Sequence, residues 1–174
     1  IPTGLTLVVI ISIFGPISGA HFNPVVSLIF WFKKIISLMD LVAYVLFQII
    51  GAIFGCLAAN IIFGLPVITI STHVRHDLSQ FLSEILATFG LVLVIFLARE
   101  VARLNIPVLV GSYIASAYWF SSSTSFANPA VTIARQFSDT FTGISPSGIP
   151  SFVLAQIFGA ILGYIVVQWL SRDM

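Results

Sequence analysis

Two Asn-Pro turns are the residues of this sequence best suited to act on a small molecule. Asn23-Pro24-Val25 and Asn128-Pro129-Ala130 each open a short apolar stretch. Because Asn is a strong N-cap and Pro is favoured at the first helical position, each turn predicts the start of a helix. Such a start carries about half a positive charge and several free backbone N–H groups. Two of them facing each other, with the Asn amides as donors, would hydrogen-bond a neutral solute and repel cations.

Other kinds of chemistry find little support in the sequence. Cys56 stands alone within an apolar run, so neither a disulfide nor a cysteine-bound metal is expected. We find no nucleophile paired with a base, no cluster of metal ligands and no phosphate-binding loop. We therefore expect no enzyme activity, no cofactor and no metal site. A net charge of +1 also gives no electrostatic footprint for nucleic acid.

The composition is that of a protein largely covered by membrane lipid. Hydrophobic residues make up 59% of the chain and charged residues 7%, whereas an average soluble domain has about 25% charged residues. A bilayer core of about 30 Å requires about 20 apolar residues in a helix. Five stretches are long enough, at residues 1–18, 40–63, 80–98, 106–122 and 149–170. We therefore predict an all-α membrane protein with five transmembrane helices.

Two further apolar stretches are too short to cross a bilayer. They run over residues 23–32 and 128–137, and each begins at one of the Asn-Pro turns. Each is predicted to be a re-entrant half-helix that starts inside the membrane. Irregular backbone at that depth is tolerated only where protein or a water-filled cavity surrounds it.

The chain contains an internal repeat. A shift of 105 residues places Asn23-Pro24 on Asn128-Pro129, and a shift of 108 places residues 45–55 on 153–163. The first repeat covers residues 1–63 and the second 79–170, within one channel domain of residues 1–174. The partner of the span 80–98 would lie upstream of Ile1, so we expect that the chain is truncated and lacks the first helix of its first repeat. Three spans per repeat require opposite orientations, the inverted arrangement that places a working site near the midplane.

Basic residues predict how the chain is oriented. Cytoplasmic loops carry an excess of Lys and Arg. Arg75 and Arg135 fall on one side of the predicted bundle, and five basic residues fall on the other, namely Lys33, Lys34, Arg99, Arg103 and Arg172. The C-terminus is therefore expected in the cytoplasm.

The two motifs resemble those of a known family. Residues 18–26 (SGAHFNPVV) and 125–131 (SFANPAV) are similar to the two signatures of the major intrinsic proteins, the aquaporins and aquaglyceroporins. The resemblance covers essentially the whole chain and implies an aquaporin-like right-handed helical bundle, with five of six transmembrane helices and both re-entrant half-helices. It also implies one pore per subunit and a homotetramer. The segment from Tyr118 to Arg135 resembles a bacterial branch associated with arsenic resistance, and so implies the bacterial inner membrane.

The function that the resemblance implies is a passive channel for water and small neutral solutes such as glycerol, urea or arsenite-like hydroxides, which excludes ions and protons. Family members usually place Arg after the second Asn-Pro-Ala, where it forms a narrow outer filter, but here the residue is Val131. Spacing from the two Asn residues places the other filter positions at Thr3, Ser116 and Ser125. This ring is uncharged and should admit solutes larger than water. Val25, where Ala is usual, is a milder departure.

Three polar residues near the motifs are further candidates. Arg135 follows the second turn on the same helical face. It either lines the outer vestibule as a displaced cation, or pairs with Asp139 or loop carbonyls. An acid at the position of Glu84 often supports a re-entrant loop in the family, although an acid in a first helical turn also suits the helix dipole. His21 either faces the inner mouth of the pore or hydrogen-bonds to its own loop.

Two functions other than a channel are compatible with this architecture. A secondary transporter also uses inverted repeats and broken helices, but it generally needs more intramembrane charge than this chain offers. A non-conducting membrane scaffold is the second alternative, and the two intact Asn-Pro turns disfavour it.

Paired glycines predict how some of the helices cross. Gly51 and Gly55 occupy the same repeat positions as Gly159 and Gly163. Small residues spaced four apart allow helices to approach closely. Both pairs are therefore expected to form close helix crossings within the subunit.

Overall fold

The chain folds as a bundle of α-helices. The computed structural model describes residues 1–102 and 105–172, without the side chains of residues 101 and 102. Arg103, expected on the cytoplasmic side, lies outside the described residues. The described part is all-helical, as predicted, and its α-helices are α1 (Pro2–Ser18), α2 (Pro24–Phe32), α3 (Leu38–Ile62), α4 (Leu78–Leu97), α5 (Ile106–Phe120), α6 (Pro129–Ala134) and α7 (Ile149–Leu170). A π-helix, Ala98–Ala102, extends α4, and short 3₁₀ helices cover Arg135–Phe137 and Pro146–Gly148.

Three of the five helices that were predicted to cross the membrane have the length that a crossing needs. α3, α4 and α7 are long and apolar enough to cross a membrane, whereas α1 and α5, with 17 and 15 residues, are shorter apolar helices. α5 ends earlier than predicted because Ser121 takes an extended conformation, with φ −108° and ψ 132°. α6 has only six residues, and the 3₁₀ turn after it carries the second half-helix to Phe137.

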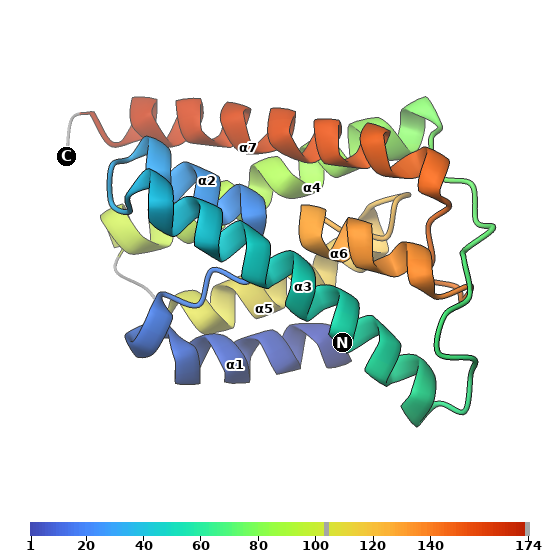
Figure 1. Ribbon diagram of the computed structural model, residues 1–174. Coiled ribbons are helices and arrows are strands. Elements are labelled where there is room, and N and C mark those ends of the chain that lie inside the picture. The colour runs from blue at the N-terminus through green and yellow to red at the C-terminus, as the bar shows by residue number, and fades with distance from the viewer. Residues whose placement is uncertain (103–104, 173–174) are drawn as a thin grey trace.

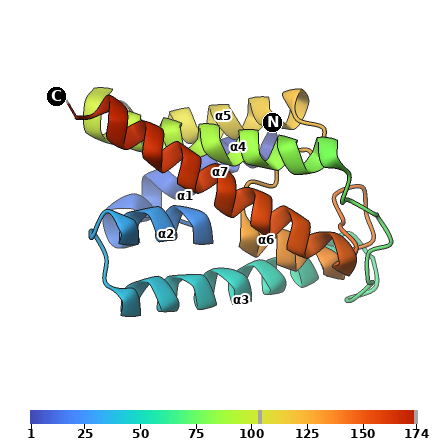
Figure 2. The ribbon, with the colours of Figure 1, turned by 90° about the horizontal axis from the view of Figure 1, so that it is seen from above.

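The two half-helices start at the centre of the molecule and run towards opposite ends (Figure 1). α1 packs on α5 and α4 packs on α7, and each half-helix contacts both α3 and α7. Figure 2 shows α3 on the opposite side of the molecule from α4 and α5. Elements about 105 residues apart therefore occupy corresponding places, as an inverted repeat requires.

A buried arginine fixes the loops at the end of the molecule away from the C-terminus. Arg75 is 8% exposed and donates to three loop carbonyls, those of Gly143 at 2.8 Å, Phe141 at 2.8 Å and Ser123 at 3.3 Å. Burial lowers the pKa of Arg75, although a guanidinium stays charged at any ordinary pH. The guanidinium thus provides hydrogen-bond donors for loop carbonyls that have no partner within a helix.

The two glycine pairs differ in their surroundings. A Cβ on Gly159 would clash with the carbonyl oxygen of Ile85, and one on Gly163 would lie 2.9 Å from the carbonyl oxygen of Phe89, both on α4. By contrast, no atom of the described residues lies within 4 Å of a Cβ built on Gly51 or Gly55. Among the described residues, the second pair therefore makes the predicted close crossing and the first pair makes none. α4 covers α7, but nothing in the described residues covers α3 in the same way.

Candidate functional site

The two loops that precede the half-helices share one backbone conformation. Ala20 and Ser125 have φ values of 48° and 50°, and Phe22 and Ala127 have values of 49° and 47°. Each pair is separated by 105 residues, the same shift that superimposes the Asn-Pro turns. Non-glycine residues rarely adopt positive φ, and such residues persist only where surrounding contacts hold them. The repeat is thus preserved in a strained local geometry at the place where the loops meet.

The two asparagines link these loops across the centre of the molecule. Asn23 Nδ2 donates to the carbonyl of Ala127 at 2.7 Å, and Asn128 Nδ2 donates to the carbonyl of Phe22 at 2.8 Å. Each side-chain oxygen caps its own half-helix, by accepting from the N–H of Val25 at 3.1 Å or of Ala130 at 3.0 Å. One amide hydrogen of each Asn is left without a partner in the described chain. A solute passing between the two half-helices meets these two donors.

Glu84 supports the second loop from behind. Its carboxylate is fully buried and accepts four hydrogen bonds, two of them from the N–H groups of Phe126 and Ala127 at 2.8 Å each. Ser123 Oγ donates at 2.6 Å and Gln156 Nε2 at 2.7 Å. The carboxylate thus fixes the residue whose carbonyl receives the Asn23 amide. The first loop differs, because the N–H groups of residues 21 and 22 have no acceptor in the part of the chain that the structure describes.

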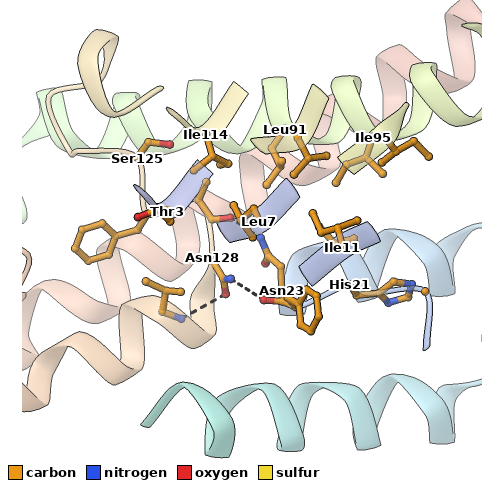
Figure 3. Close-up of a pocket in the computed structure, with 18 of the residues that line it drawn as sticks. Thr3, Leu7, Ile11, His21, Asn23, Leu91, Ile95, Ile114, Ser125 and Asn128 are labelled. Atoms are coloured by element: carbon orange, nitrogen blue, oxygen red, sulfur yellow. Dashed lines mark hydrogen bonds between the residues drawn. The ribbon is translucent and has the colours of Figure 1, made fainter. Parts of the chain in front are cut away.

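A cavity of about 180 Å³ lies between the two loops and three helices. Residues spaced four apart form its walls, as expected for one face of a helix. Thr3 and Ser125 lie at one end, His21 lies at the other, and the two asparagines lie between them (Figure 3). The long helices contribute Thr3, Leu7 and Ile11 from α1, Leu91, Ile95 and Arg99 from α4 and its extension, and Ile106, Val110, Ile114 and Tyr118 from α5. The half-helices contribute Val26 and Phe30 from α2 and Val131 from α6.

Three of the four predicted filter residues line this cavity. They are Thr3, Ser125 and Val131, but Ser116 does not reach it. Ser116 is exposed and its hydroxyl donates to the carbonyl of Ser112 at 2.9 Å. Because Ser116 lies two residues from Tyr118, it is rotated by about 200° around a helix with 3.6 residues per turn. The prediction of Ser116 is therefore wrong, and α5 contributes Tyr118 at this end of the cavity.

Arg135 lies beside the same end of the cavity. Its guanidinium packs over the ring of Phe126, with Cζ 4.2 Å from the centroid, and Nη2 donates to the hydroxyl of Tyr118 at 3.2 Å. The alternative of a pair with Asp139 is not seen, since that carboxylate instead accepts from the N–H of Thr72 at 2.8 Å. This hydrogen bond is the main reason that the pKa of Asp139 is lowered.

His21 occupies the opposite end and combines both of its predicted placements. It lines the cavity, and its Nδ1 lies 3.0 Å from Ser27 Oγ in the half-helix α2. Its ring stacks on Tyr44, with centroids 4.8 Å apart. Arg99 is also at this end, with its Cζ 5.1 Å from the centroid of Phe30. The only charged residues that line the described cavity are thus two arginines, one near each mouth.

Sequence reasoning missed Tyr118 and Phe126 as members of the site. The sequence analysis looked for filter residues at fixed spacings from the two Asn-Pro turns and for charged residues beside them. Neither aromatic residue met these criteria. A period of four from Ile106 through Tyr118 was the available signal, because it marks one face of α5.

Comparisons with known proteins give relatives of one kind. A model of the major intrinsic protein family matches residues 1–123. The chain is 48% identical to "Aquaglyceroporin AqpS" of Rhizobium meliloti (strain 1021) over 172 residues, which cover 99% of this chain and 74% of that protein. It is 36% identical to "Aquaporin NIP1-1" of Arabidopsis thaliana, with 98% of this chain and 62% of that protein covered. It is 32% identical to "Aquaporin-4" of Mus musculus, with 90% and 46% covered.

Proposed function

This chain belongs to the major intrinsic protein family, and from that premise we propose that its pore passes glycerol-sized neutral solutes as well as water. Membership and the aquaporin and aquaglyceroporin relatives support a passive channel in a membrane. The observation that carries the wider selectivity is the outer end of the cavity, which is lined by the small uncharged residues Thr3, Ser125 and Val131. The 48% identical relative is itself described as an aquaglyceroporin.

The ends of the two half-helices account for ion exclusion in this proposal. The N-termini of α2 and α6 meet at the centre, and each carries about half a positive charge. The Asn amides replace part of the hydration of a neutral solute, but they offer only donors to a cation. The apolar residues Leu7, Ile95 and Ile114 line the opposite wall. A solute with hydroxyl groups on one side and carbon on the other fits a pore that has amide donors on one wall and apolar side chains on the other.

We place the channel in the inner membrane of a bacterium, with its C-terminus in the cytoplasm and four subunits per assembly. The described basic residues support the orientation. Lys33 lies at the same end as Glu100, with Nζ 2.9 Å from the carboxylate, and the C-terminal end of α7 lies at this end too (Figure 1). Arg75 and Arg135 lie at the other end. Excess positive charge at one end marks the cytoplasmic side.

We further propose that a helix from outside residues 1–174 covers α3 as α4 covers α7. The uncovered Gly51 and Gly55, and the unpaired N–H groups of His21 and Phe22, support this proposal. An acid on that helix would accept from both N–H groups, as Glu84 does in the second repeat.

Leucine substitutions at the two glycine pairs test this covering helix. In the complete protein in its membrane, Gly51→Leu should reduce the yield of folded channel as strongly as Gly159→Leu, measured by size-exclusion chromatography. An effect of Gly159→Leu alone would show that α3 faces lipid.

Flux measurements on purified protein in liposomes test the solute. Stopped-flow light scattering should show water and glycerol permeability above that of empty vesicles, linear in the gradient and independent of proton or sodium gradients. Val131→Arg should narrow the outer end and reduce glycerol permeability at least tenfold more than water permeability. Flux that saturates and depends on an ion gradient would identify a transporter instead. Urea and arsenous acid, assayed in the same vesicles, define the range of neutral solutes.

A further inference from the structure

The guanidinium of Arg135 is held in one place by two aromatic residues. Its plane lies against Phe126, which belongs to the loop before the second Asn-Pro turn, and its Nη2 bonds to Tyr118 on α5. Cation–π packing and a hydrogen bond to a charged group are both strongest where water is excluded. Phe126 is itself only 5% exposed and is fixed by Glu84 through its N–H. The position of the charge therefore depends on these contacts.

Two polar atoms at this end of the cavity have no partner in the protein. Arg135 Nη1 and Ser125 Oγ are both buried without a hydrogen bond to any described residue. Ser125 as a whole is 2% exposed, and both residues line the cavity. Buried polar groups are nearly always hydrogen-bonded, so an unpaired donor and an unpaired hydroxyl in one cavity indicate that something else binds them.

We propose that Tyr118 is a specificity-determining residue, which positions the Arg135 guanidinium so that it binds the oxygen of a solute together with Ser125. The inference rests on the proposed channel function and deepens it. Arg135 Nη1 can only donate, whereas the hydroxyl of Ser125 can donate or accept. A small neutral solute with more than one hydroxyl group has an oxygen for each of them. A solute that lacks a second oxygen leaves one of the two groups unpaired, and leaving a buried donor unpaired is costly.

The position of the charge also explains how a pore with Val131 rejects cations. Arg135 follows Val131 by four residues, so its Cα lies about 6 Å further along the half-helix. Tyr118 and Phe126 hold the guanidinium against the outer end of the cavity, so the end remains electropositive while the ring of small residues stays open. The width of the pore and its charge are therefore set by different residues.

Removing the Tyr118 hydroxyl is the direct test. Tyr118→Phe deletes the hydrogen bond to Arg135 and retains the ring. We expect the ratio of glycerol to water permeability to fall about tenfold or more, the factor that one hydrogen bond to a charged group represents. Tyr113→Phe is the matched control, since this tyrosine is on the same helix but donates to the carbonyl of Ala87 and does not line the cavity. The ratio of glycerol to water permeability of Tyr113→Phe should equal that of the wild type.

A lysine at position 135 completes the test. Arg135→Lys keeps the charge but loses the planar guanidinium, so it should lower the ratio as Tyr118→Phe does. Because both changes act on one interaction, the double variant should be no worse than either single variant.

The results distinguish a failure of the positioning role of Tyr118 from a failure of the proposed channel function. An unchanged ratio in Tyr118→Phe, in vesicles that still conduct water, would overturn the positioning role and leave the channel function intact. Additive losses in the double variant would overturn it as well. A wild-type protein that passes neither water nor glycerol would refute the channel function itself.

Discussion

Replacing Glu84 by Gln probes how strongly one carboxylate holds the pore together. The glutamate accepts four hydrogen bonds in a fully buried site. A glutamine has one oxygen and one NH₂ group, so in either orientation the backbone N–H of Phe126 or that of Ala127 faces another donor. The hydroxyl of Ser123 and the amide of Gln156 can turn an oxygen to the new NH₂ group, but a backbone N–H cannot. Each buried donor without a partner costs about 1–3 kcal/mol, so the substitution should destabilise the folded protein by about 1–3 kcal/mol, although the side chain keeps its size.

The consequence should reach the pore through the loop that Glu84 holds. Ala127 donates to Glu84 and accepts from Asn23, so a displaced loop removes one of the two bonds between the half-helices. We expect a lower midpoint of thermal unfolding in detergent and a loss of most water permeability. Glu100→Gln is the matched control: its partner is Lys33 at the edge of the molecule, where an ion pair contributes about 0–1 kcal/mol.

The comparison of these two variants tests whether the hydrogen bonds to Glu84 stabilise the protein and hold the pore loop in place. Equal midpoints for Glu84→Gln and Glu100→Gln would refute the view that buried donors at Glu84 control stability. A large loss of stability with normal water permeability would show that the loop is held by its other contacts.

Three shorter predictions follow from the same contacts. Hydrogen bonding from Thr72 lowers the pKa of Asp139, so its contribution to stability is complete above the ordinary Asp pKa of about 4 and is lost as the pH falls through the lowered value; Asp139→Asn should therefore weaken the dependence of thermal stability on pH below about pH 4. Asn128→Asp removes the donor to the carbonyl of Phe22 and adds a negative charge, so solute flux should fall and a cation current should appear in planar bilayers. Arg75→Lys cannot reach three carbonyls at once, so its loops should be cut faster by chymotrypsin than those of the wild type.

Local signals were sufficient to predict the class of the fold. Long apolar stretches and Asn-Pro at two helix starts depend only on neighbouring residues, and the predicted helices are confirmed to within a few residues. The sequence did not distinguish Gly51 from Gly159, because the segments around them, residues 45–55 and 153–163, are identical at eight of eleven positions. Their difference lies in whether another helix covers them, and no property of α3 or α7 alone contains that information.

The site was predicted less completely, for a geometric reason. Counting back from Asn128 assumes that α5 and the loop after it have the same lengths as in related proteins. α5 ends at Phe120, and the residues of α5 nearest this end that line the cavity include Ile114 and Tyr118, so counting selected Ser116 on the wrong face. Tertiary contacts also determined whether Arg135 lines the cavity or pairs with Asp139. Its competing partner, Asp139, was four residues away and therefore available, but Thr72 from a distant loop occupies that carboxylate.

The separation of charge from width suggests why a valine can replace the usual arginine without opening the pore to ions. Coulomb interactions extend over about 8 Å at physiological ionic strength, whereas steric exclusion acts only on contact. A guanidinium moved outward by about 6 Å therefore keeps most of its effect on an approaching cation, but no longer narrows the ring. Arg99 at the opposite mouth and the two half-helix N-termini at the centre add positive potential along the remaining path. Cation exclusion is thus distributed along the pore, and the outer ring is free to vary with the size of the solute.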